Sequence, residues 1–264
     1  MKRTLIEPSL CDFPAELHSV IRGAAIYDSS CSQEARVYFI DKEGGFFLKS
    51  APLGSLGREA AMTEFFHKKG LGAEVLDYLS DTEGGRDWFL SRRVAGEDCV
   101  APEYLAQPAR LCDILAERLR ALHETSLEGC PVPDHTALYL ETVDNNYRSG
   151  MFDTHFMHGM CPFSTADEAW HTVDQNRGRF KTDVLLHGDY CLPNVMLDGW
   201  RFSGFIDLGN GGVGDRHVDI FWGVWSLYYN LKTDAYRDRF LDAYGRDLVD
   251  TDMLRVIAAA ETFG

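Results

Sequence analysis

Hydrophobic and polar residues in the first part of the chain follow the short, interrupted pattern of β-strands. Each run is rich in β-forming residues and is bounded by glycines or small polar residues, as strands of a sheet are. The last two runs flank the turn sequence DTEGG, which predicts a β-hairpin. The predicted strands cover residues 24–30, 34–40, 44–50, 73–80 and 86–94.

A helical spacing interrupts these strands at residues 55–70, and Gly70 ends it. Its predicted apolar face consists of Ala60, Ala61, Phe65 and Phe66. The first part of the chain is therefore expected to be a small α+β lobe, with a sheet of five antiparallel strands and one helix.

Beyond Gly96 the pattern becomes mainly helical. Residues 108–124 carry leucines on one stripe, which predicts an amphipathic helix. Further helical patterns lie near 136–149, at 165–176 and from about 217 to 260, and strand-like breaks lie at 183–190, 194–199 and 202–209. We therefore predict two lobes: residues 1–94 would bind nucleotide, and residues 95–264 would carry catalysis and substrate binding. An apolar run within the last helical region is interpreted as helix core rather than as an aromatic ligand site: Phe221, Trp222, Val224, Trp225 and Leu227.

Composition excludes several classes of protein. The chain has 264 residues, 45% of them hydrophobic, and no apolar run approaches the ~20 residues that a membrane span needs. No signal-peptide core stands at the N-terminus. The seven cysteines are odd in number and scattered, which indicates free thiols in a reducing cytoplasm rather than disulfides or metal ligands. A monomer or weak dimer is expected.

The net charge of −15 argues against a nucleic-acid partner. Residues 1–95 hold 14 acids and 12 bases, whereas residues 96–264 hold 27 acids and 14 bases, a net of −13. The excess of acids in the second part has two interpretations. It keeps the protein soluble, or it attracts a cationic substrate.

The segment LLHGDYCLPNVMLDGWRFSGFIDLG, residues 185–209, carries the most specific chemistry. Asp189 and Asp207 each follow a short apolar strand, and Asn194 comes five residues after Asp189. An amide and an acid are ligands that Mg²⁺ accepts beside phosphate and water, which leaves Asp189 to accept a proton. Each of the three residues alone could be an ordinary turn residue, but the joint pattern favours phosphoryl transfer.

The sequences HGDYCLPN and GFIDLG resemble the catalytic and metal motifs of the aminoglycoside 3'-phosphotransferase (kanamycin kinase) family. The resemblance extends over most of the chain and is strongest over residues 185–225. It implies a protein-kinase-like fold, ATP or GTP as the phosphoryl donor, and Mg²⁺. It also implies that Asp189 is the catalytic aspartate and that Asn194 and Asp207 are the Mg²⁺ ligands.

The resemblance extends to the nucleotide site. Lys49, in FFLKS, matches the strand lysine that contacts the phosphates, and Glu59 matches the helix acid that pairs with it. Glu64 lies on the same predicted helix and is the competing candidate. Exposed positions on a strand end and a helix face are the ordinary alternatives for Lys49 and Glu59.

Six further residues complete the implied nucleotide site and its support. The segment YDSSCSQEARVY contains no glycine, so the resemblance assigns phosphate contacts to Ser30 and Ser32. Adenine would pair with the backbone between Arg92 and Val94. The implied supporting residues are His187, in the catalytic loop, and Asp219, a buried acceptor of loop amides that needs donors around it.

Asp219 comes only 12 positions after Asp207, which leaves no room for the long activation segment of a protein kinase. A small-molecule hydroxyl is therefore the expected acceptor. Glu261 resembles the family's near-terminal acid that meets the amines of the drug, and antibiotic resistance would follow. Residues 155–160 are rich in His and Met where the family has an acidic loop.

That departure keeps a choline-like or homoserine-like amino alcohol, or another amino sugar, open as the acceptor. A nucleotide-binding protein without turnover and a structural interaction module are the alternatives from other classes. The complete set of motif residues speaks against the former, and no motif supports the latter.

Overall fold

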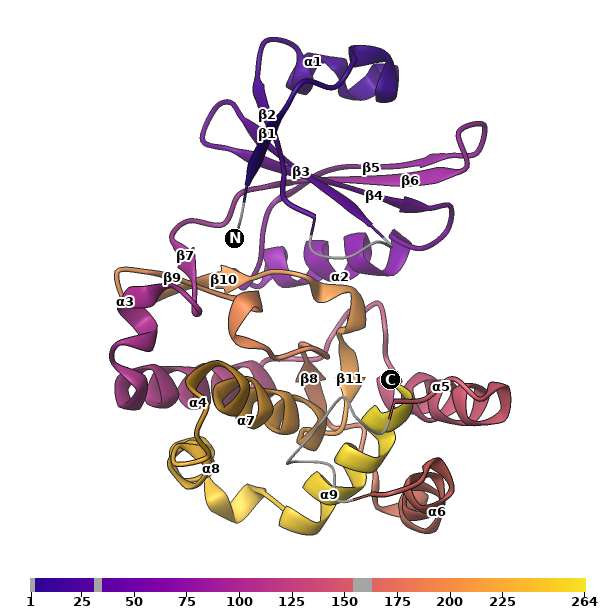
Figure 1. Ribbon diagram of the computed structural model, residues 1–264, viewed down its shortest axis with the longest axis vertical. Coiled ribbons are helices and arrows are strands. Elements are labelled where there is room, and N and C mark those ends of the chain that lie inside the picture. The colour runs from indigo at the N-terminus through magenta and orange to yellow at the C-terminus, as the bar shows by residue number, and fades with distance from the viewer. Residues whose placement is uncertain (1–2, 31–34, 154–162) are drawn as a thin grey trace. The chain divides into compact units, whose positions relative to one another are not determined.

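The computed structural model describes residues 3–30, 35–153 and 163–264. It divides into two compact units (Figure 1). The first unit consists of residues 1–98 together with residues 196–209, and the second of residues 99–195 and 210–264. The first unit therefore includes residues 196–209, which follow the motif HGDYCLPN in the sequence.

The described part of the first unit is built on an antiparallel sheet. In sheet order its strands are β1 (Thr4–Ile6), β2 (Ala25–Asp28), β3 (Arg36–Asp41), β4 (Phe46–Pro52), β6 (Arg86–Arg92) and β5 (Val75–Asp81). The five predicted strands and the hairpin are confirmed. The expectation of five strands in the sheet was wrong by one, because Thr4–Ile6 pairs with β2 at its edge.

The two faces of this sheet have different neighbours because side chains alternate along each strand. On β4, Phe46 and Leu48 pack with Phe13 and Leu17 of the N-terminal segment. That segment contains short 3₁₀ turns, at Leu10–Asp12 and Ala15–Leu17, and the one-turn helix α1 (His18–Ile21). The opposite face carries Lys49 and is covered by α2 (Gly57–Lys68), which lies across the sheet from α1 in Figure 1.

The helix α2 turns a partly polar face toward the sheet. Ala60, Phe65 and Phe66 are buried as predicted, but Ala61 is exposed, so that part of the predicted face was wrong. The buried face includes Glu59, Met62 and Thr63, and the Glu59 carboxylate pairs with Lys49 of β4. The prediction of a single helix also has to be corrected, because α1 belongs to the same unit.

A smaller sheet completes the first unit, with the order β10 (Arg201–Phe205), β9 (Val195–Asp198) and β7 (Glu97–Asp98). Gly96 precedes β7 with φ of 84°, and a Cβ there would overlap the carbonyl oxygen of Leu197. Glycine therefore allows the chain leaving β6 to pass close to β9.

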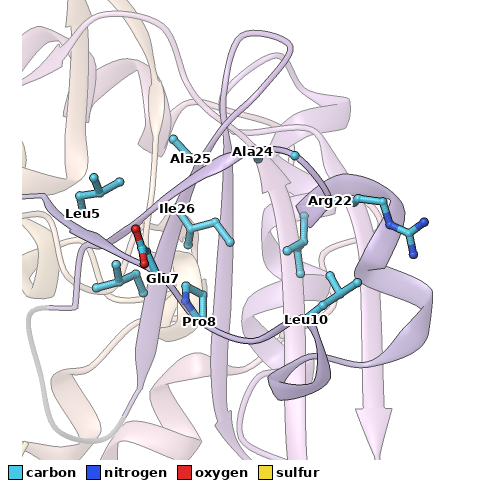
Figure 2. A pocket seen from close by; sticks show the side chains of 11 residues that line it. Leu5, Glu7, Pro8, Leu10, Arg22, Ala24, Ala25 and Ile26 are labelled. Atoms are coloured by element: carbon cyan, nitrogen blue, oxygen red, sulfur yellow. The ribbon is translucent and has the colours of Figure 1, made fainter.

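A cavity of about 410 Å³ lies beneath the N-terminal segment of the first unit (Figure 2). Its wall is mostly aliphatic, with Leu5, Leu10 and Ile26 among the lining residues and Glu7 and Arg22 as its charged members. Leu10 and Ile26 belong to the core on the face of the sheet away from Lys49. The cavity is therefore not a candidate phosphate site.

The second unit is mainly helical, as predicted. Its helices are α3 (Pro102–Leu105), α4 (Pro108–His123), α5 (His135–Ser149), α6 (Ala166–Asn176), α7 (His217–Leu231), α8 (Arg237–Tyr244) and α9 (Thr251–Ala260). The leucine stripe of α4 is buried throughout, with Leu111 and Leu119 fully inaccessible to solvent. Short 3₁₀ turns link or extend these elements at Arg177–Arg179, Leu192–Asn194, Leu208–Asn210, Arg246–Leu248 and Glu261–Phe263.

A two-stranded antiparallel sheet, β8 (Val184–Leu186) with β11 (Gly212–Gly214), presents the catalytic motif. The apolar run on α7 is only partly core. Phe221, Val224 and Leu227 are buried, whereas Trp222 and Trp225 are half-buried on a different side of the helix. The interpretation of both tryptophans as helix core was therefore wrong.

Within the described residues, the helices are too short or too polar to traverse a lipid bilayer.

Candidate active site

Three charged side chains meet in the first unit. The Lys49 Nζ lies 2.7 Å from the Glu59 Oε2 and 3.1 Å from the Asp207 Oδ1. Lys49 comes from β4, Glu59 from the first turn of α2, and Asp207 from the turn after β10. Glu64, the competing candidate, pairs with Lys68 on the surface of α2 instead.

Burial and charge act in opposite directions on this group. Burial would lower the pKa of Lys49, but the carboxylates of Glu59 and Asp207 raise it above its ordinary value. Burial raises the pKa of Glu59, and the Lys49 ammonium opposes that rise. Lys49 is therefore charged at neutral pH. Its ammonium group neutralises the buried Glu59 and also faces the exposed carboxylate of Asp207.

Asp207 adopts a strained backbone conformation. Its φ is 59°, in the left-handed region that residues other than glycine rarely adopt. Its side chain is 53% exposed, so burial does not explain the strain. Such positions cluster at functional sites, where the surrounding structure holds the side chain in one direction.

The motif HGDYCLPN forms a tight loop in the second unit, between β8 and the 3₁₀ turn Leu192–Asn194. Gly188 opens this loop with φ of 84°, and a Cβ there would overlap the carbonyl of Asn210. The amide nitrogen of Asn194 donates to the Asp189 backbone oxygen at 3.0 Å and to its Oδ2 at 2.8 Å. The loop thus fixes the Asp189 carboxylate and Asn194 against each other.

Asp219 fixes this loop through hydrogen bonds to its backbone. It is fully buried, and its carboxylate accepts hydrogen bonds from the His187 N–H and the Gly188 N–H, both at 2.8 Å. The ring of His123 lies 3.3 Å from the same carboxylate, and burial lowers the pKa of His123, which keeps that ring neutral. His187 in turn accepts from the Asp189 N–H at 3.3 Å through its Nδ1.

His123 was missed in the sequence. It lies 96 residues from Asp219, and its other ring nitrogen is 2.7 Å from the Tyr244 hydroxyl. Its position at the end of the predicted helix 108–124 gives no indication of these contacts.

Ser30 lies in the turn after β2, where its Oγ accepts from the Val37 N–H at 3.0 Å and its own N–H donates to Asp28 at 2.9 Å. The Ser30 N–H and hydroxyl both donate to the Asp28 carboxylate and hold its pKa below the ordinary value. Ser32 lies outside the described residues, as does the His- and Met-rich segment 155–160.

Part of the backbone at the end of β6 already makes hydrogen bonds within the protein. The N–H groups of Arg92 and Arg93 donate to the carbonyls of Glu74 and Gly45 at 2.9 and 3.0 Å. Of this segment, the Val94 N–H has no protein acceptor in the described part of the chain. Phe47, which no sequence motif marked, is half-buried on the Lys49 face of β4 with its ring 5.3 Å from that of Phe39. The two-residue period of a strand places Phe47 beside Lys49.

Glu261 is 8% exposed and belongs to the 3₁₀ turn after α9. Its Oε1 accepts from the Tyr139 hydroxyl at 2.7 Å and from the Trp222 indole at 3.1 Å. Burial raises the pKa of Glu261 to about 7; these two donors oppose the rise, and the charges of Asp189 and Asp219 add to it. Glu261 and Asp189 both belong to the second unit.

Asn194 in the second unit and Asp207 in the first each carry an oxygen of the kind that magnesium accepts. Both acceptors that Asn194 contacts belong to Asp189, so its amide nitrogen points there and its carbonyl oxygen remains to face a cation. Asp207 offers an exposed carboxylate. No group of three or more His, Cys, Asp or Glu able to hold a metal occurs among the described residues.

Comparison with known proteins defines the class and then the family. The phosphotransferase enzyme family matches residues 30–256, which places the chain among phosphotransferases. A probable aminoglycoside 3'-phosphotransferase of Lactococcus lactis subsp. lactis (strain IL1403) is 48% identical over 252 residues, which cover 96% of this chain and 95% of that protein. An aminoglycoside 3'-phosphotransferase of Niallia circulans is 30% identical over 68% of each chain. The chain belongs to the aminoglycoside 3'-phosphotransferase family.

Solved structures confirm the predicted fold. A type VIII aminoglycoside 3'-phosphotransferase superposes with a TM-score of 0.74 at 22% identity, over 95% of this chain and all of that chain. The aminoglycoside phosphotransferase APH(3'')-Id of Streptomyces rimosus, in complex with ADP and streptomycin, gives a TM-score of 0.72 at 20% identity over 86% of this chain and 90% of that chain. The family, the protein-kinase-like fold and the assignment as an enzyme are therefore confirmed.

Proposed function

We propose that this enzyme transfers the γ-phosphoryl group of ATP, with GTP as an alternative donor, to the 3'-hydroxyl of a kanamycin-type aminoglycoside. The observation that carries the proposal is the 48% identity to the Lactococcus protein over nearly the whole chain. The reaction would take place in the cytoplasm and would make its host resistant to the drug.

Asp189 is the residue that we assign to the acceptor hydroxyl. It orients the hydroxyl and takes its proton as the new bond to phosphorus forms. The Asn194 amide holds one carboxylate oxygen at 2.8 Å, which leaves the other oxygen for the acceptor. Because the bond-making step is mostly a matter of alignment and charge, a rigid Asp189 contributes by positioning.

The first unit supplies the contacts to the nucleotide. Lys49 would bind the phosphates, with its direction set by Glu59. We assign Ser30 and Ser32 to the phosphates as well, and the Ser30 hydroxyl would exchange its hydrogen bond with Asp28 for one with phosphate. The ring of Phe47 offers a flat apolar surface for a base on the same face, and the backbone from Arg92 to Val94 would meet the edge of that base through the Val94 N–H.

We assign Asn194 and Asp207 as the protein ligands of Mg²⁺. The bound ion would neutralise charge on the β- and γ-phosphates. The proposed role of His187 and Asp219 is structural, because they fix the loop that carries Asp189.

An aminoglycoside carries several ammonium groups, so its site should be acidic. Glu261 is assigned to the acceptor, since it is a buried acid of the same unit as Asp189 and resembles the family's near-terminal acid. A choline-like or homoserine-like amino alcohol is the runner-up acceptor, because such a molecule also joins a cation to a hydroxyl.

The test is the variant Asp189→Asn, assayed with Mg·ATP and kanamycin. We expect kcat to fall about 10³-fold, because general-base positioning is lost, while nucleotide affinity measured by calorimetry changes little. Asp238→Asn is the matched control, because Asp238 is a surface acid of the same unit with 82% exposure. An unchanged kcat in Asp189→Asn would refute the mechanism. Nucleotide binding without turnover in the wild type would favour a binding protein.

A further inference from the structure

Asp87 of β6 is a buried acid of the first unit that has no part in the candidate active site described above. Its exposed fraction is 0%. Its carboxylate accepts hydrogen bonds from the Leu56 N–H at 3.0 Å, from the Tyr78 hydroxyl at 3.0 Å and from the Ser80 hydroxyl at 2.7 Å. Tyr78 and Ser80 belong to β5, whereas Leu56 is the N-cap residue of α2. Asp87 therefore connects two strands of the sheet to the beginning of the helix that carries Glu59.

Asp87 faces the same side of the sheet as Lys49. In the pairing of β4 with β6, Phe89 lies opposite Lys49 and Asp87 lies opposite Ala51. Because side chains alternate along a strand, residues two positions apart point to one side of the sheet. Asp87 thus lies on the side that α2 covers, as Lys49 does.

The hydrogen bond from Leu56 is one that a different residue makes in many helices. In a capping box, the acid at the third helical position accepts from the N–H of the N-cap residue. The third position of α2 is Glu59, counted from Gly57, but the Glu59 carboxylate pairs with Lys49 at 2.7 Å instead. Asp87 therefore accepts from the N–H that Glu59 would otherwise bind, which leaves Glu59 to pair with Lys49.

Burial of the N-cap residue makes this substitution necessary. Leu56 is 3% exposed and packs with Ala60 and Phe89, so its N–H is shielded from water. A buried N–H without an acceptor is costly. If Asp87 were removed, Glu59 would be the acid three residues away that could turn back to the Leu56 N–H, and it would then leave the cation that it now neutralises.

We propose that Asp87 is a positioning residue that keeps Glu59 paired with Lys49 and so keeps the lysine directed toward the phosphates of the nucleotide. This inference rests on the proposed function, in which Lys49 binds those phosphates. Asp87 contacts neither nucleotide nor acceptor and acts through Glu59. Because Asp87 belongs to the same unit as α2, the Lys49–Glu59 pair forms without a modification or a partner protein that moves the helix.

The experiment measures the Kd of Mg·ADP by titration calorimetry, with adenosine as a ligand that lacks phosphate. We expect Asp87→Ala to raise the Kd of Mg·ADP about 5- to 50-fold, because Glu59 turns to Leu56 and Lys49 loses its direction. Asp87→Asn keeps an oxygen that accepts from Leu56, so its effect should be smaller, about 2- to 5-fold. The Kd of adenosine should change less than about 2-fold in both variants, since Lys49 is assigned to the phosphates alone.

Two further variants separate positioning from stability. In a Glu59→Ala background, Asp87→Ala should raise the Kd of Mg·ADP less than about 2-fold, because the residue through which Asp87 acts is already gone. Ser80→Ala is the matched control, since it removes one donor to the same carboxylate and leaves the hydrogen bond from Leu56. This control should lower the urea midpoint of unfolding but change the Kd of Mg·ADP less than about 2-fold.

Unchanged binding of Mg·ADP in both Asp87→Ala and Asp87→Asn overturns the inference. An equal rise in the Kd of adenosine, or the same rise in the Glu59→Ala background, also overturns it, since either result would show that Asp87 does not act through Glu59. If Asp87→Ala does not fold, the same comparisons are made with Asp87→Asn.

Transfer to kanamycin is measured separately. Binding of Mg·ADP with the expected shifts but without phosphorylation of kanamycin by the wild type would refute the proposed function and leave the role of Asp87 standing. Absence of Mg·ADP binding in the wild type would overturn both.

Discussion

The two units hold their charged residues in different ways. In the first unit, Lys49 lies between Glu59 and Asp207, so the three charged groups compensate one another. In the second unit, Asp219 is entirely buried and receives two backbone N–H groups, with the neutral ring of His123 beside it. One arrangement depends on opposite charges, whereas the other depends on hydrogen bonds to a single carboxylate.

This difference has a functional meaning. A partly exposed cation and carboxylate can exchange their contacts with each other for contacts with a charged ligand at low cost. A buried acid that is hydrogen-bonded to a loop backbone cannot exchange those bonds at low cost, so it keeps the loop in one conformation. We infer that the first arrangement suits the binding and release of nucleotide, and that the second suits a fixed catalytic Asp189.

The largest effect is expected from Asp219→Ala. The change leaves the N–H groups of His187 and Gly188 buried without their acceptor, so the free energy of unfolding should fall by about 3–5 kcal/mol. Urea unfolding at neutral pH measures it. The control Asp238→Ala removes an exposed acid and should alter stability by less than about 0.5 kcal/mol. A loss below about 1 kcal/mol in Asp219→Ala would show that the hydrogen bonds to Asp219 do not hold the loop.

A smaller, pH-dependent effect is expected from Lys49→Met. Glu59 then loses its cation, so its pKa, already raised by burial, rises further. A folded state that binds the proton more tightly than the unfolded state loses stability as the pH increases. We expect Lys49→Met to cost about 1–3 kcal/mol at pH 8 and much less at pH 5.

The double variant Lys49→Met with Glu59→Gln separates charge from packing. Because glutamine does not titrate, stability at pH 8 should recover and its dependence on pH should flatten. Nucleotide affinity should stay low. Lys68→Met is the control, since Lys68 pairs with Glu64 on the helix surface and should contribute about 0.3–0.5 kcal/mol. Equal destabilisation of Lys49→Met at both pH values would contradict the account of the first unit.

Much of the fold could be predicted from local pattern. The leucine stripe of α4 and the hairpin of β5 and β6 have strong periodicity and clear turn residues, so both are found as expected. The strands β1 and β11 are three residues long, and the sequence of β11 is Gly-Val-Gly, so no pattern marked them. Their pairing depends on distant strands.

The site residues also divide into contacts that are local in sequence and contacts that depend on distant residues. Asp189 and Asn194 are close in sequence, and a turn between strands brings them together. The partner of Asp219 could not be predicted, because His123 is distant in sequence and its position depends on how α4 packs with α7. The aromatic run on α7 was ambiguous, because a helix with apolar residues on several sides does not reveal which tryptophans reach the core.

The most direct test of the central claim is to compare kanamycin with its 3'-deoxy analogue as acceptors for the wild-type enzyme with Mg·ATP. The account predicts rapid formation of ADP and a kanamycin phosphorylated at the 3'-oxygen, located by phosphorus and proton NMR, and no phosphorylation of the deoxy analogue. Equal turnover of both compounds, or phosphate at another position, would contradict it.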